Sequence, residues 1–164
     1  MVSLITGRKG SGKTKRLIEQ VNKAVEASSG NVVCVEKERL LTYDINYRAR
    51  LIETDFYKVS GYKAFYGFLS GICAGDHDIT DILIDATLRI GGRDYDELAV
   101  FLEKVKELSD ITEKNFVFTV SADDEELPEK ILTSARNFKR KKSKKLKFLL
   151  TKPAQEDIIL SARI

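Results

Sequence analysis

The chain of 164 residues has little of what a secreted, membrane-spanning or zinc-binding protein needs. Its two cysteines, Cys34 and Cys73, lie in apolar stretches without metal-ligand spacing, and its one histidine, His77, lies in a polar turn. This scarcity argues against a zinc site and favours reduced thiols in the cytoplasm. No apolar run approaches the ~20 residues that cross a bilayer. The first predicted strand begins at Val2, so we expect neither a signal peptide nor a membrane contact.

The chain also lacks an internal repeat, a long linker and a boundary rich in Pro, Gly or Ser. Its length and its 43% hydrophobic content suit one domain with a core. Seven of its 28 basic residues lie within 139–147. The rest of the chain has 21 basic and 25 acidic residues. We therefore expect one domain over residues 1–151, mildly acidic apart from this basic segment, and a C-terminal arm over 152–164.

The basic segment Lys139–Lys147 is open to three interpretations. Its side chains could bind nucleic acid phosphates through salt-sensitive contacts that read no bases, or they could bind an acidic protein partner. No aromatic residue stands among the lysines before Phe148, so a base-stacking platform is not predicted. A solvated tail is the third interpretation.

One short motif is present in full. Residues 7–14 read GRKGSGKT and fit the phosphate-loop pattern G-x-x-x-x-G-K-S/T at every position. A short apolar run at 2–6 precedes the motif, and residues 13–27 follow with the apolar spacing of one helix face. A strand, a glycine-rich loop and a helix form the context in which backbone N–H groups and a helix dipole hold phosphates.

All eight residues of this loop are expected to bind nucleotide: Gly7, Arg8, Lys9, Gly10, Ser11, Gly12, Lys13 and Thr14. The glycines allow the backbone to curl close to the phosphates. Lys13 supplies a mobile cation for the β- and γ-phosphates. Thr14 supplies a hydroxyl for Mg²⁺, which prefers oxygen ligands.

Strands and helices are predicted to alternate along the chain. After the first strand and helix, the patterns predict strands at 31–36, 49–54, 81–85, 116–121 and 145–151, and helices at 61–74, from Asp94 to about 108, and from Pro128 to about 137. Such alternation predicts right-handed βαβ units. The expected fold class is α/β, a three-layer α/β/α sandwich with a mostly parallel central sheet.

A second motif is predicted where the apolar strand Ile82-Leu83-Ile84 ends in Asp85. Ligands of open α/β sheets bind outside the carboxyl ends of the strands, so Asp85 is expected on the same rim as the loop. There it would hold Mg²⁺ through water, together with Thr14. The alternative is an ordinary turn residue at the end of a strand.

Through residues 7–14, Asp85 and the strand order along roughly 1–135, the chain resembles the phosphate-loop NTPases, and within them the RecA-like branch. It is similar to small bacterial ATP-binding proteins, some of them labelled as similar to twitching-motility ATPases, although those motors carry further histidine and acidic motifs that this chain lacks. The resemblance implies ATP and Mg²⁺ as cofactors, and it leaves room for a homo-oligomer. Many members of the branch have a glutamate directly after the second-motif aspartate, where this chain has Ala86.

In RecA-like proteins the catalytic glutamate follows the strand after the phosphate-loop helix. The corresponding strand here ends in Val35-Glu36-Lys37-Glu38. The resemblance therefore implies Glu36 as the base that activates water, with Glu38 as the second candidate. Lys13, Glu36 and Asp85 are then the expected catalytic residues, and a solvated charged loop is the alternative for Glu36.

Two further groups of polar residues are candidates at the same rim. Thr119 and Ser121 end the strand at which members of this branch sense the γ-phosphate, although ordinary strand-end polarity explains them too. Arg89 and Arg93 flank two glycines in the predicted loop after Asp85. An arginine there could stabilise transition-state charge, in cis or across a subunit interface, or it could be a solvated surface residue.

Three functions fit these motifs. The first is a Mg²⁺-dependent ATPase or ATP-driven switch. The second is a small-molecule kinase, although the arginines of 37–58 and 86–96 form no clear lid motif. The third is a nucleotide-binding regulator without significant turnover, which the missing acid after Asp85 supports. ATP is favoured over GTP because Lys114-Asn115 does not supply an N-K-x-D guanine pocket.

Overall fold

The computed structural model describes residues 1–41, 44–123, 126–129 and 131. These residues form an α/β fold around a five-stranded sheet in which every neighbouring pair is parallel. The strands are β1 (Val2–Thr6), β2 (Asn31–Glu36), β3 (Arg50–Glu53), β4 (Ile79–Ile84) and β5 (Asn115–Val120), and their order across the sheet is β1-β5-β4-β2-β3. The predicted parallel sheet is thereby confirmed for the described strands.

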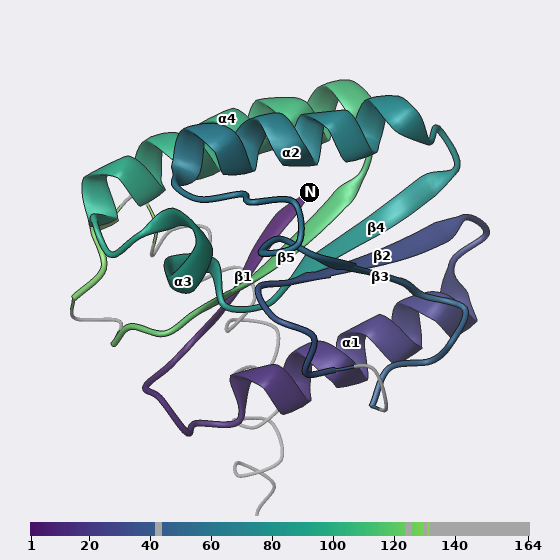
Figure 1. The fold of residues 1–164 in the computed structure, drawn as a ribbon, viewed down its shortest axis with the longest axis horizontal. Helices are drawn as coiled ribbons and strands as arrows, with labels where there is room; N and C mark the ends of the chain where they lie inside the picture. The colour runs from purple at the N-terminus through teal and green to yellow at the C-terminus, as the bar shows by residue number, and fades with distance from the viewer. Residues whose placement is uncertain (42–43, 124–125, 130, 132–164) are drawn as a thin grey trace, which may run out of the picture.

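Helices cover both faces of this sheet. The helices are α1 (Lys13–Ala27), α2 (Tyr62–Gly75), α3 (Thr87–Gly91) and α4 (Tyr95–Thr112). Figure 1 shows α1 on one side of the sheet and α2 and α4 on the other. Two apolar clusters fill the spaces between the layers, one that includes Leu17 and Val21 of α1 and one that includes Phe65 and Phe101 of α2 and α4.

The alternation of side chains along the strands decides which face each strand-end residue takes, because successive residues point to opposite faces. The apolar cluster between the sheet and α1 contains three strand residues that are each followed, two positions later, by a polar residue. Residues two positions apart in a strand share a face of the sheet. The pairs are Cys34 and Glu36, Leu83 and Asp85, and Val117 and Thr119. The three polar residues therefore face the same side as α1, at the carboxyl ends of β2, β4 and β5.

The structure adds one helix that the sequence did not predict. The segment after Asp85, predicted to be a loop, contains α3, so the assignment of Arg89 to a loop is wrong. Leu88 and Ile90 are buried there, and this burial favours the helical turn. At five residues, α3 is too short to produce a recognisable apolar period.

The start of α4 is confirmed as predicted. The side chain of Asp94 accepts hydrogen bonds from the backbone N–H groups of Asp96 (2.9 Å) and Glu97 (3.0 Å), as an N-cap does.

The described residues include only the start of the predicted C-terminal elements. Glu129 and Ile131 are helical, in agreement with the helix expected from Pro128. The rest of that helix, the basic segment 139–147, the predicted strand 145–151 and the arm 152–164 lie outside the described residues. Across the part of the chain that is described, no helix is long and apolar enough to span a membrane.

Candidate functional site

The loop between β1 and α1 depends on glycine for its shape. Gly10 and Gly12 have φ angles of 82° and 78°, which residues with a Cβ rarely adopt. A Cβ at either position would meet no atom within 4 Å, so backbone strain rather than lack of space favours glycine. Gly7 also has a positive φ, 146°, and a Cβ there would in addition lie 2.5 Å from Ser11 Oγ.

The amino end of α1 is suited to an anion. Gly12 is the N-cap residue, no described side chain caps the helix, and its first turn contains no acidic residue. The first N–H groups of a helix have no partner within the helix, and the helix dipole adds partial positive charge there. By contrast, α4 has the Asp94 cap and two acidic residues in its first turn. The N-terminus of α1 is therefore available to phosphate; that of α2 is uncapped too, but α1 is the helix that follows the glycine-rich loop.

Lys13 is buried at this end of α1, with 7% of its surface exposed. Its Nζ donates a hydrogen bond to the carbonyl oxygen of Arg8 at 2.6 Å. Burial lowers the pKa of Lys13, the charge of Asp85 raises it in opposition, and Arg16 lowers it further. An anionic partner would stabilise the charged form of this partly desolvated ammonium group.

The structure brings the two predicted motifs together. Thr14 Oγ1 lies 3.3 Å from Asp85 Oδ2 and 3.5 Å from Asp85 Oδ1, although the two residues are 71 positions apart in the chain. The backbone N–H of Asp85 donates to the carbonyl of Val35 at 2.8 Å, which continues the pairing of β4 with β2. A hydroxyl and a carboxylate side by side are the hard oxygen donors that Mg²⁺ prefers, so these residues fit the ion.

Asp85 is also held from the side of β5. Thr119 Oγ1 donates to Asp85 Oδ1 at 2.6 Å and accepts a hydrogen bond from the backbone N–H of Ala86 at 2.9 Å. Ala86 has a left-handed conformation, with φ 58° and ψ 40°, which costs about 1–2 kcal/mol for a residue other than glycine. The contact with Thr119 helps to hold this turn from β4 into α3.

Glu36 is buried rather than solvated, with 2% of its surface exposed, so the alternative of a solvated loop is wrong for this residue. Its Oε2 accepts hydrogen bonds from the backbone N–H groups of Leu40 (2.9 Å) and Leu41 (3.1 Å). Among the described residues, its Oε1 is buried without a hydrogen-bond partner. Burial raises the pKa of Glu36, the two backbone hydrogen bonds oppose this effect, and Glu53 and Asp85 add to it.

The raised pKa of Glu36 predicts a pH-dependent stability. Above the ordinary pKa of 4.5, the folded chain keeps a proton on Glu36 that the unfolded chain loses. The stability that Glu36 contributes is therefore fully present below that pKa and is lost as the pH rises through the higher folded pKa. Glu36→Gln does not titrate and keeps an oxygen for the two N–H groups. We expect urea unfolding to show the variant gaining stability relative to wild type between about pH 4 and about pH 7. An equal difference at both pH values would contradict the burial of a titrating Glu36.

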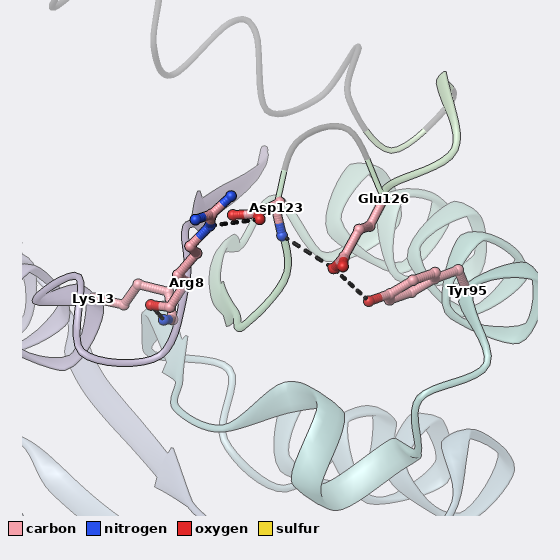
Figure 2. A network of polar contacts seen from close by, with 5 residues as sticks. All are labelled: Arg8, Lys13, Tyr95, Asp123 and Glu126. Atoms are coloured by element: carbon pink, nitrogen blue, oxygen red, sulfur yellow. Dashed lines mark hydrogen bonds and ion pairs between the residues drawn. The ribbon is translucent and has the colours of Figure 1, made fainter.

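The loop is linked to the segment that follows β5. Figure 2 shows the side chain of Arg8 reaching Asp123, where Nε and Oδ2 form an ion pair at 2.6 Å. The backbone N–H of Asp123 donates to Glu126 Oε2 at 3.3 Å, and Tyr95 Oη donates to the same oxygen at 3.4 Å. These contacts connect the phosphate-loop backbone, through Arg8, to the first residue of α4.

The remaining candidates are exposed residues. Arg89 forms an ion pair with Glu38, so both the arginine candidate and the second glutamate candidate are partnered at the surface. Arg93 and Ser121 are exposed, and their expected roles stay predictions. His77 is exposed too, and no group of three or more His, Cys, Asp or Glu side chains suited to a metal occurs in the described ranges.

No family model matches the chain, and no curated protein matches it. The residues of the site and their geometry are therefore the basis for its function.

Proposed function

We propose that this chain is an ATP-binding protein of the phosphate-loop type that acts as a Mg²⁺-dependent ATPase or ATP-driven switch. One observation carries the proposal. Thr14, at the end of the glycine-rich loop, lies within 3.5 Å of Asp85, at the end of a distant strand, beside the buried Lys13. A glycine turn that occurred by chance would not need a carboxylate from another strand at its threonine.

Each part of the site has a task in this proposal. The loop backbone and the amino end of α1 would bind the phosphates, and Lys13 would reach the β- and γ-phosphates. Thr14 and Asp85 would hold Mg²⁺, which neutralises phosphate charge when it is bound. We propose membership in the RecA-like branch as part of the same proposal.

Glu36 supports hydrolysis rather than binding alone. It lies on the same face as Asp85, at the end of the neighbouring strand, and its Oε1 has no partner among the residues described. A raised pKa brings a carboxylate closer to neutral pH, which favours a general base. Its burial favours slow turnover, so the nucleotide-binding regulator remains the second candidate function.

The test is ATP turnover by the full chain. Phosphate release is measured with Mg²⁺ and with EDTA, in the absence and presence of single- or double-stranded DNA. We expect slow release that EDTA abolishes, and stimulation by DNA would assign nucleic acid to the basic segment 139–147. Tight ATP binding without release would select the regulator. A failure to bind ATP at all would overturn the proposal.

Asp123→Asn is expected to strengthen ATP binding by about two- to fivefold. The substitution removes a negative charge beside the loop and releases Arg8, whose side chain is 80% exposed, to face the phosphates. An exposed ion pair contributes ~1 kcal/mol or less, so the unfolding temperature should change little.

The measurement for this variant is an ATP titration of Asp123→Asn beside Arg8→Ala, which should bind ATP more weakly than wild type. Glu126→Gln is the matched control, because it removes a neighbouring charge without touching Arg8. Equal affinities in all four proteins would show that the Arg8–Asp123 pair has no influence on the site.

A further inference from the structure

Thr119 is placed to act on Asp85 rather than on a ligand. It lies on β5 opposite Ile5 of β1, on the face that α1 covers, and only 2% of its surface is exposed. A threonine hydroxyl carries one proton. That proton is directed at Asp85 Oδ1, 2.6 Å away, so it is not available to a phosphate while this contact persists.

The same hydroxyl fixes Asp85 in two ways. Its proton holds Oδ1, which leaves Oδ2 as the carboxylate oxygen nearer to Thr14, at 3.3 Å against 3.5 Å. Its lone pair accepts the N–H of Ala86, the left-handed residue directly after Asp85. Both the rotation of the carboxylate and the direction of the backbone beyond it therefore depend on one oxygen atom.

We infer that Thr119 is a positioning residue that turns the Asp85 carboxylate toward Thr14 for the binding of Mg²⁺, and that it does not sense the γ-phosphate. The inference rests on the proposed function and deepens it, because it assigns β5 a task at the metal rather than at the nucleotide. Partners that orient a metal ligand typically change metal affinity by about 10- to 100-fold when they are removed.

The test separates metal binding from nucleotide binding. Dissociation constants for ATP are measured with Mg²⁺ and with EDTA for wild type, Thr119→Val and Thr119→Ser. Valine has nearly the same shape and lacks the hydroxyl, whereas serine keeps it. We expect Thr119→Val to lose about 10-fold or more of the tightening that Mg²⁺ gives. Its affinity in EDTA should equal that of wild type, and Thr119→Ser should restore the effect of Mg²⁺.

Two controls keep the result interpretable. Ser29→Ala removes an exposed hydroxyl just beyond the carboxyl end of α1, away from the loop, and should leave both constants unchanged. Thermal unfolding of each variant reports whether the fold survives the loss of the buried contacts. If Thr119→Val does not fold, Thr119→Cys replaces it, because a thiol of similar size is only a weak donor. We expect the cysteine variant to lose part of the Mg²⁺ effect.

The outcomes distinguish this inference from the proposed function. If wild type binds no ATP, the proposed function fails and the inference fails with it. If wild type binds ATP more tightly with Mg²⁺ and Thr119→Val behaves identically, only the inference is overturned. An equal loss of affinity in Mg²⁺ and in EDTA would also overturn it, because such a loss indicates a contact with the nucleotide itself.

Discussion

Lys13→Ala is expected to weaken ATP binding by about 100-fold or more, which corresponds to ~2.7 kcal/mol or more. Lys13 is the buried cation of the loop, and the partial loss of its hydration is offset by a hydrogen bond to the neutral carbonyl of Arg8 and by the charge of Asp85. An anionic ligand would replace that contact with a charge-assisted one. Isothermal titration calorimetry with ATP and Mg²⁺ measures the change.

Lys15→Ala is the matched control for this variant. It removes the same charge two residues further along α1, from a side chain that is exposed. Its ATP affinity should remain within about twofold of wild type, because a solvated charge contributes little. Burial opposes the charged form of Lys13, so its removal should not unfold the chain, and thermal unfolding checks this. Equal affinities for Lys13→Ala and wild type would exclude Gly7–Thr14 as the phosphate site.

Glu36→Gln is expected to slow ATP hydrolysis by about 10²- to 10⁴-fold while ATP affinity changes little. The amide cannot accept a proton from water, but its oxygen can accept the two N–H groups that now bind Oε2. The loss should therefore occur in kcat. Single-turnover phosphate release and an ATP titration on the same preparation separate the two quantities.

Glu38→Gln is the control for Glu36→Gln, since it makes the same substitution two residues away, in a side chain paired with Arg89 at the surface. We expect it to retain most of the turnover. A large loss in Glu38→Gln together with normal turnover in Glu36→Gln would transfer the role of base to Glu38. Normal turnover in both variants would remove this strand end from the mechanism.

Much of the fold could be predicted because its signals are local. The helix expected over residues 13–27 and the strand over 31–36 agree with α1 and β2. Each has a complete apolar period and a clear end, and the glycine-rich motif fixed the connection before α1. The same motif, with the rule that ligands bind at the carboxyl ends of parallel strands, predicted that Asp85 would lie near Thr14.

The remaining features depend on contacts between distant residues, and no local pattern reports them. The ion pair of Arg8 with Asp123 joins residues that are 115 positions apart in the chain. Arg8 lies in the glycine-rich loop, whose sequence motif indicated phosphate binding and no ion pair. The burial of Glu36 depends on the fold of the chain at Leu40 and Leu41, whose N–H groups turn back onto its carboxylate. The charged letters around it suggested a solvated loop, because sequence shows charge but not burial.

Thr119 illustrates the same limit. Its place at the end of a strand was predicted, and its face follows from alternation along β5. Its hydroxyl proton could have been directed at a ligand, at water or at a neighbouring strand. Only the register of β4 with β5 brings Asp85 within 2.6 Å and decides between these partners.

The central claim, that Gly7–Thr14 hold the phosphates of a nucleotide, is tested most directly by titrating the wild-type chain with ATP and, in parallel, with adenosine, both in the presence of Mg²⁺. Because the loop, Lys13 and the amino end of α1 are all expected to bind phosphate, ATP should bind saturably at one site per chain. Adenosine, which lacks the phosphates, should bind far more weakly. Equal binding of the two compounds, or no saturable binding of ATP, would contradict the account.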